Sequence, residues 1–459
     1  QACALDKKPD VIITVDNGIS SVEGVAFAKS QGLSVIVTDH HLPGDSLPAA
    51  DAIVNPQCCH DSFASSNLAG VGVAFYLCIA LRAYLQKQDY FAKQSIALPH
   101  MASLLDLVAL GTIADLVVLD KNNRILAYQG LARIRTGKCV HGLRALCSLA
   151  KIPLSTLSSE DIAFRVAPKL NAAGRMDDMR IGVACLLADD YETAYRFANQ
   201  LVTFNNDRRQ VQQDMFDKAY RMVQEVDDSC RGVSLYDATW HQGVIGILAS
   251  RIKEICYKPV IVFAPGDDNE IKGSARSIEG VNIRELLACV AQRNPGLLTK
   301  FGGHAMAAGL SLLKDDLEKF KRAFSEVCDD ICATCFTEQV VHDGPLAVAE
   351  LTLDTAKLIA EFGVWGQGFS QPLFVNSFRI MSKRLLKAKH ILLDLQLDGR
   401  PYRAVWFNAA RHYDTLAEDV DVALCYRLSV SEYLGVERLD ILINDIVTHV
   451  CQPEETAAV

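Results

Sequence analysis

Apolar residues form two runs near the start of the chain, with a helical pattern between them. Leu33–Val37 is strongly apolar, which predicts a buried parallel strand, and Val11–Val15 predicts a strand that precedes it. The segment between them, Ser20–Gln31, has apolar residues at helical spacing and is closed by Gly32. This order predicts a βαβ unit, whose two strands end at the same edge of a sheet.

A long helical pattern follows in the middle of the chain. From Tyr191 to about Val226 the apolar residues keep a helical period, and no proline or glycine interrupts them. One helix of this length would measure roughly 50 Å and could connect two domains. Its middle, Asn205–Gln210, is polar on every face, which favours a solvent-exposed helix that crosses a cleft between the domains. Two shorter helices broken near Asn205 are the alternative.

The second half of the chain predicts a smaller α/β domain and then a β-barrel. Val233–Tyr236, Pro259–Phe263 and Ile271–Ala275 are predicted strands, and Gly243–Ile255 is a predicted helix. Short strands separated by turns follow, which is typical of a small barrel. They are Phe378–Met381, His390–Leu397, Tyr402–Phe407, Val420–Leu428 and Leu439–Ile446.

Length and composition fit several domains rather than one. A chain of 459 residues is too long for a single core. We predict an α/β domain over 1–188, a connecting helix over 189–228, a smaller α/β domain over 229–336, a barrel over 337–451 and a tail over 452–459. No run approaches the roughly 20 apolar residues of a membrane span, and no secretory leader is visible at the start. We expect a soluble, cytoplasmic protein with no membrane partner.

The net charge of −9 argues against indiscriminate nucleic-acid binding, because lysine and arginine dominate the affinity for phosphates. It still allows a basic channel on an acidic body. The candidates, each of which could equally belong to a solvated face, are Arg208, Arg209, Arg276, Lys383, Arg384, Lys387 and Lys389.

The chain has fifteen cysteines and no visible secretory leader, so we interpret the cysteines as reduced thiols. Cys328, Cys332 and Cys335 have a spacing that could ligate an iron–sulfur cluster. The amphipathic pattern from Leu317 to Ile331 favours packing at a helix end instead.

Acidic residues and imidazoles stand where the predicted elements end. Asp16 follows the first strand, Asp39-His40-His41 follows the second, and Asp115 follows an apolar helical face and a Gly-Thr turn. A single Asp there would be most simply a turn former or a helix cap. Three such acids in a βα pattern are hard to attribute to caps. Asp16 and Asp39-His40-His41 should converge at the carboxyl edge of the sheet, and this set of ligands favours a divalent metal such as Mn²⁺ or Mg²⁺.

These motifs resemble those of a known family. Val15–Gly18, Asp39–His41 and Gly111–Asp115, in this order, are similar to motifs of the DHH phosphoesterases, and Phe301–Gly309 resembles the glycine-rich loop of their associated second domain, DHHA1. Arg165–Met176 and His241–Gly246 are similar to the branch of bacterial single-strand-specific 5′-to-3′ DNA exonucleases.

For the first domain, the resemblance implies roles for five residues. Asp16 would bridge two metal ions in the intact protein, and His40 and Asp115 would ligate one of them. His41 would contact the scissile phosphate. Asp39 points to the opposite face of its strand, so we expect it to orient an imidazole.

The second domain would hold the substrate. Gly302 and Gly303 leave backbone N–H groups free to approach an anion, and His304 can donate to it; a helix start packed against a strand is the alternative. Ser274 and Arg276 alternate on one strand and could grip one phosphate together. The resemblance implies that this pair, with Arg175, recognises a 5′-terminal phosphate.

The resemblance also identifies the barrel as an OB-fold, which commonly binds single strands by stacking and electrostatics. Trp406, Phe407, Tyr426 and Tyr433 could supply stacking faces, although such aromatic residues more often belong to a core.

The implied function is a metal-dependent 5′-to-3′ exonuclease that degrades single-stranded DNA to mononucleotides in DNA repair and recombination. The implied partners are single-stranded DNA with a 5′ end, single-strand-binding protein and a helicase, and the implied state is a monomer. Two alternatives stay open: a phosphoesterase for short oligonucleotides or nucleotides, and a non-catalytic DNA-binding scaffold.

One family motif is missing. DHH enzymes carry an earlier strand that ends in Asp-x-Asp-Gly, whose two acids ligate the metals, and this chain has no such motif before Asp16. We therefore expect the chain to be N-terminally truncated and inactive by itself, and the intact protein to be the exonuclease.

Overall fold

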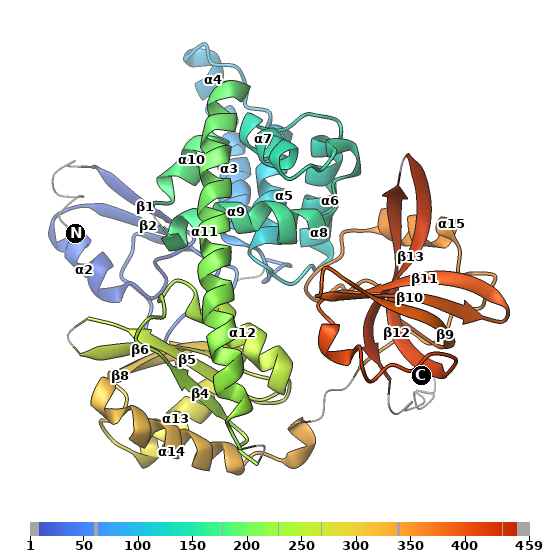
Figure 1. Ribbon diagram of the computed structural model, residues 1–459. Helices are drawn as coiled ribbons and strands as arrows, with labels where there is room; N and C mark the ends of the chain where they lie inside the picture. The colour runs from blue at the N-terminus through green and yellow to red at the C-terminus, as the bar shows by residue number, and fades with distance from the viewer. Residues whose placement is uncertain are drawn as a thin grey trace, which may run out of the picture. The chain divides into compact units, whose positions relative to one another are not determined.

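The computed structural model describes residues 9–58, 63–176, 178–227, 229–267, 269–336, 340–433 and 435–447. The chain forms two compact units (Figure 1). The first combines residues 1–167 with residues 340–459, and the second spans residues 168–339. The tail predicted over 452–459 lies outside the described residues.

The first unit begins with the predicted βαβ arrangement. Strands β1 (Val11–Val15), β2 (Ser34–Thr38) and β3 (Ala52–Val54) form a parallel sheet in the order β1-β2-β3. Helix α2 (Val22–Ser30) connects β1 to β2 and buries Val25 and Ala28. Because Val15 pairs with Thr38, the two strands end side by side.

A helical region follows in the same unit. The longer helices are α3 (Gly70–Lys87), α5 (Leu105–Ala114), α6 (Lys121–Arg135) and α7 (His141–Leu149). Shorter elements are α4 (Tyr90–Lys93), the 3₁₀ turns Met101–Leu104 and Leu154–Thr156, α8 (Ser159–Asp161) and a π-helical turn over Ile162–Val166. Helix α5 is almost entirely apolar, which suits an element packed against both α3 and α6.

The predicted barrel is confirmed. Its strands are β9 (Phe374–Leu386), β10 (His390–Leu397), β11 (Arg400–Trp406), β12 (Asp421–Tyr433) and β13 (Val436–Ile446). They close in the order β10-β11-β13-β12-β9, and helix α15 (Leu353–Phe362) packs against β12 and β13.

Two of the four proposed stacking aromatics belong to the barrel core instead. Tyr426 is fully buried and Trp406 is buried, because their strands turn these side chains inward. Phe407 is exposed, and the side chain of Tyr433 lies outside the described residues.

The second unit contains the long helix. Helix α9 (Ala167–Met176) spans the boundary between the units in sequence, and α10 (Arg180–Leu186) and α11 (Tyr191–Gln224) follow. Helix α11 is unbroken, so the alternative of two shorter helices is wrong (Figure 1). Its middle is not solvated all round, because Asn205 is buried while most of its neighbours are exposed or half-buried.

The sheet of the second unit has the order β4-β5-β6-β8-β7. The strands are β4 (Val233–Tyr236), β5 (Val260–Pro265), β6 (Glu270–Arg276), β7 (Lys300–Gly303) and β8 (Ala307–Leu313), and the helices are α12 (Ile245–Cys256), α13 (Ile283–Arg293) and α14 (Leu317–Asp329). In its core Phe320 stacks on Phe324 and meets the ring of Phe263 edge-on. Within the described residues, no helix is long and apolar enough to cross a membrane.

Candidate metal centre and phosphate site

Asp16 stands at the carboxyl end of β1 in a backbone conformation that most residues avoid. Its φ is +67°, in the left-handed region that Asp tolerates better than most side chains. Its N–H still donates to the carbonyl of Thr38 at 3.0 Å, so the turn leaves directly from the sheet. The carboxylate is thereby placed beside the end of β2.

Asp39 organises the end of β2. The side chain is 1% exposed, and its carboxylate accepts hydrogen bonds from the N–H groups of Ile19, His40 and His41 and contacts Nδ1 of His41 at 2.7 Å. Burial alone would raise the pKa of Asp39, but these hydrogen bonds outweigh it and the pKa lies below its usual range. An ionised Asp39 therefore fixes the imidazole of His41, as an orienting residue would.

His40 brings the two other acids together. Its Nε2 lies 3.0 Å from Oδ1 of Asp16 and 3.4 Å from Oδ2 of Asp115. One ligand atom from each of Asp16, His40 and His41 lies within 4.8 Å of the others. Asp115 adjoins this group through His40, so the structure gathers all the residues expected at the centre, and it adds His41 to the candidate ligands.

The donor set fits a divalent cation. The ring nitrogen Nε2 of His40 is buried and makes no hydrogen bond with the described residues, although two carboxylate oxygens are close to it. A buried nitrogen aimed at two carboxylates is costly without a partner, and a cation would provide one for all three groups. Oxygen and imidazole ligands suit Mn²⁺ or Mg²⁺.

Asp115 caps the C-terminus of α5, and its N–H donates to the carbonyl of Gly111 at 3.0 Å. Burial raises the pKa of this carboxyl; a charge on His40 opposes the rise and the charge of Asp16 adds to it. The carboxylates of Asp16 and Asp115 share one imidazole and repel each other. A bound cation would offset this repulsion.

Gly70 is a residue of this site that our sequence analysis did not identify. It is the first residue of α3, and a Cβ at this position would lie 2.2 Å from Oδ1 of Asp16. Only glycine allows the helix to begin so close to the carboxylate. The spacing Ala69-Gly70-Val71-Gly72 was the available signal, but it does not indicate which side chain approaches.

Ser274 and Arg276 lie together on β6 in the second unit. Nη1 of Arg276 donates to Oγ of Ser274 at 3.1 Å and to the carbonyl of Ala275 at 2.8 Å. Both side chains face Gly246 in the first turn of α12, where a Cβ would lie 2.9 Å from Nη2 of Arg276. The predicted common face is confirmed by this geometry.

The glycine pair lies on the same sheet. Gly302 and Gly303 end β7, so they are part of a strand and not the start of a helix. The strand register places Gly302 opposite Gly309, and Gly309 opposite Ser274. A Cβ at Gly302 or at Gly309 would meet nothing within 4 Å, so this row is an open floor beside Ser274. His304 follows with an exposed side chain, and its backbone N–H donates to the carbonyl of Ala307.

Arg175 is in α9, but its side chain lies outside the part of the chain that the structure describes. The metal group belongs to the first unit, and Ser274, Arg276 and the glycine row belong to the second.

Comparison with known proteins reveals three family matches along the chain. The DHH family N-terminal domain matches residues 2–112, the DHHA1 domain matches residues 223–330, and the RecJ OB domain matches residues 342–445.

Curated relatives match over nearly the whole chain. "Single-stranded-DNA-specific exonuclease RecJ" of Escherichia coli is 46% identical over 452 residues, which cover 95% of this chain and 77% of that protein. The Bacillus subtilis protein of the same name is 31% identical over 440 residues, which cover 95% of this chain and 53% of that protein.

Solved structures show the same fold. RecJ from Thermus thermophilus in complex with Mn²⁺ superposes with a TM-score of 0.81 at 27% identity, and the match covers 98% of this chain and 64% of that one. Its complex with Mg²⁺ gives a TM-score of 0.75 at 26% identity and covers 96% of this chain and 62% of that one. The chain thus spans about three quarters of the E. coli relative and less than two thirds of the T. thermophilus chain.

Proposed function

This chain belongs to the RecJ family of DHH proteins, and we propose that it is the larger part of a metal-dependent exonuclease. The enzyme would degrade single-stranded DNA from the 5′ end to mononucleotides, in DNA repair and recombination. The observation that carries the proposal is the cluster in which Nε2 of His40, without a hydrogen bond, faces the carboxylates of Asp16 and Asp115.

In this proposal Asp16, His40 and Asp115 hold one divalent cation, Mn²⁺ or Mg²⁺, and Asp16 also contacts a second. When bound, the metal pair supplies an activated water and positive charge for phosphodiester hydrolysis. Gly70 has no side chain, so the carboxylate of Asp16 can occupy the space beside the start of α3.

His41 would act on the substrate. Its Nδ1 faces the ionised Asp39, which favours a proton on that nitrogen. Its side chain is about half exposed, so Nε2 can reach a phosphate of the bound strand. Asp39 is then a positioning residue, because it sets the orientation of His41 and touches no substrate.

The phosphate site of the second unit would anchor the 5′ end. A guanidinium beside a hydroxyl, next to a floor without side chains, suits a terminal phosphate. Ser274, Arg276, Gly302, Gly303 and His304 would bind it, with Arg175 assigned by family resemblance. An anchored end explains a 5′-to-3′ polarity, because cleavage then occurs at a fixed distance from the anchor.

The barrel favours a polymer over a short oligonucleotide as the substrate, because a substrate of one or two nucleotides needs no additional domain along its path. We further propose that the protein acts as a monomer in the cytoplasm, where single-strand-binding protein and a helicase would supply its substrate.

The test is hydrolysis of a 5′-phosphorylated, 3′-labelled single strand with Mn²⁺. It compares this chain with a longer form that carries the Asp-x-Asp-Gly strand, and each with its His40→Ala variant. Stepwise release of mononucleotides by the longer form, lost in its His40→Ala variant and absent on blunt duplex, is expected. Binding without hydrolysis by both forms would contradict the proposal and support a scaffold.

A further inference from the structure

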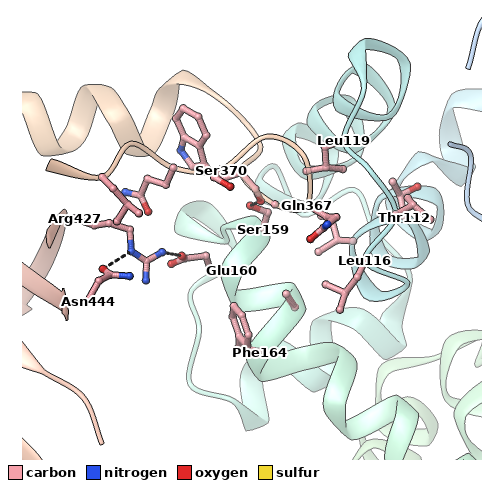
Figure 2. Close-up of a pocket in the computed structure, with 17 residues that line it drawn as sticks. Thr112, Leu116, Leu119, Ser159, Glu160, Phe164, Gln367, Ser370, Arg427 and Asn444 are labelled. Atoms are coloured by element: carbon pink, nitrogen blue, oxygen red, sulfur yellow. Dashed lines mark hydrogen bonds and ion pairs between the residues drawn. The ribbon is translucent and has the colours of Figure 1, made fainter. Parts of the chain in front are cut away.

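A cavity of about 390 Å³ lies in the first unit, away from the side chains assigned above (Figure 2). One wall comes from the end of α5 and from residues 159–164. The other comes from residues 365–373 and from the barrel residues Arg427 and Asn444. Its volume falls in the range of roughly 300–1,000 Å³ that is usual for small-molecule sites.

Polar contacts hold the two walls together. Nη1 of Arg427 pairs with Glu160 at 2.9 Å, as Figure 2 shows. The hydroxyl of Ser159 donates to the carbonyl of Trp365 at 2.8 Å, and the N–H of Leu119 donates to the carbonyl of Gln367 at 2.7 Å. The cavity is therefore built in advance of any ligand.

Phe164 lines the cavity and is nevertheless 69% exposed. It lies in the π-helical turn Ile162–Val166, and such turns are rare and frequently mark functional sites. A large aromatic ring that is mostly exposed contributes little to folding. Its placement is explained if a ligand covers it.

The opposite wall is held in place by a stack of aromatic rings. Trp365 lies between Phe362 and Phe369, with ring centroids 5.8 Å and 4.9 Å away and interplanar angles of 22° and 13°. Its indole N–H donates to the carbonyl of Ile359 at 2.9 Å. The stack ends on Arg124, whose guanidinium lies 4.1 Å from the ring centroid of Phe369.

Three of the polar residues in the lining are amides, beside the hydroxyls of Thr112, Ser159 and Ser370 and the ion pair of Glu160 with Arg427. Gln367, Gln371 and Asn444 each carry a donor and an acceptor. One exposed aromatic ring with amides in the same lining matches a nucleobase, which has apolar faces and an edge of donors and acceptors.

The cavity adjoins the metal centre through α5. Thr112, Ile113 and Leu116 line it, and these residues flank Asp115, which lies 3.4 Å from His40. A base in the cavity would thus belong to a nucleotide close to the phosphodiester that is cleaved.

We propose that this cavity is a base-binding subsite, which takes one unpaired nucleobase of the DNA strand against the exposed ring of Phe164. The inference rests on the proposed function and deepens it. A base can enter only when it has no complementary partner, so the subsite gives single-strand selectivity a physical cause.

The test measures binding and needs no turnover. Fluorescence anisotropy would report the affinity of the chain for 5′-phosphorylated single strands, each with one abasic nucleotide at a successive position. Loss of one base at a single position should weaken binding about tenfold, the usual size of a base–aromatic contact. Phe164→Ala should weaken binding to the intact strand about as much, and the abasic nucleotide should then have no further effect.

Two further variants make the outcome specific. Phe164→Trp keeps an aromatic face and should keep the sensitivity to that abasic position. Tyr84→Ala removes an equally exposed aromatic residue from α3, outside the cavity, and should leave the abasic profile unchanged.

Failure of the subsite can be distinguished from failure of the proposed function. Tight binding with an abasic profile that is the same in the wild type and in Phe164→Ala would overturn the subsite alone. Absence of single-strand binding by the wild type would overturn both.

Discussion

Nε2 of His40 lies 3.0 Å from Oδ1 of Asp16, yet 24 residues separate these two residues in the sequence. The contact follows from topology, because two parallel neighbours end at one edge of the sheet. It joins an acid in a left-handed turn to an imidazole that has no hydrogen bond at Nε2. The chemistry that we propose depends on this pair.

Gly70→Ala should weaken Mn²⁺ binding at least tenfold. The added Cβ would lie 2.2 Å from Oδ1 of Asp16, so either the carboxylate or the start of α3 must shift. Isothermal titration with Mn²⁺ measures the loss. Gly24→Ala in α2 is the control, because its Cβ would approach only Ser21 at 3.9 Å, and unchanged affinity in both variants would refute the role of Gly70.

Asp39→Asn should lower the free energy of unfolding by about 2–3 kcal/mol, because the amide offers only one acceptor where three N–H groups and an imidazole now converge on a buried carboxylate. Urea denaturation measures the change. The control is Asp45→Asn, which changes an exposed acid shortly after His41. It should have the same free energy of unfolding as the wild type. Equal midpoints for Asp39→Asn and the wild type would contradict this account.

Arg276→Ala should abolish most of the preference for a 5′-phosphate over a 5′-hydroxyl, and Arg276→Lys should restore part of it, because lysine keeps the charge and loses the planar fork. Competition binding with the two kinds of single strand measures the ratio. The control is Arg293→Ala. It removes an exposed arginine of α13 that pairs with Asp330, and it should keep the wild-type ratio. If Arg276→Ala leaves the ratio of the two affinities unchanged, this site does not bind the 5′-phosphate.

Among the cysteines that the structure describes, Cys332 should react first with a thiol reagent, and Cys328 last. Hydrogen bonds from Thr334 lower the pKa of the exposed Cys332 thiol, whereas burial raises the pKa of Cys328 to about 12. Near neutral pH, Cys332 therefore holds the larger thiolate fraction, and its labelling should level off at a lower pH. Timed alkylation with mass spectrometry gives the order, and equal rates would contradict it. The packing predicted for Cys328 is confirmed, while Cys332 is exposed.

The sequence could predict the elements that depend on local periodicity. Strands β1 and β2, the long α11 and the five barrel strands all follow apolar patterns, and parallel strand order then brings Asp16 to His40. Contacts that depend on tertiary packing carry no such pattern. The approach of Gly70 to Asp16 is of this kind, as is the burial of Asn205.

The cavity could not be predicted for the same reason. Its walls are joined by a hydrogen bond between Ser159 and Trp365, which are 206 residues apart in the sequence. The exposure of the barrel aromatics could not be predicted either. Trp406 and Tyr426 lie on strands and point into the core, whereas Phe407 lies in the turn after β11 and is exposed.

The central claim is that Asp16, His40 and Asp115 hold a divalent cation, and Mn²⁺ titration of this chain and of His40→Ala tests it most directly. Electron paramagnetic resonance counts the free and bound ion without any need for turnover. Saturable binding by the wild type that weakens at least tenfold in His40→Ala is the expected result. Equal Mn²⁺ affinity in the two proteins, or no saturable binding by either, would contradict the account.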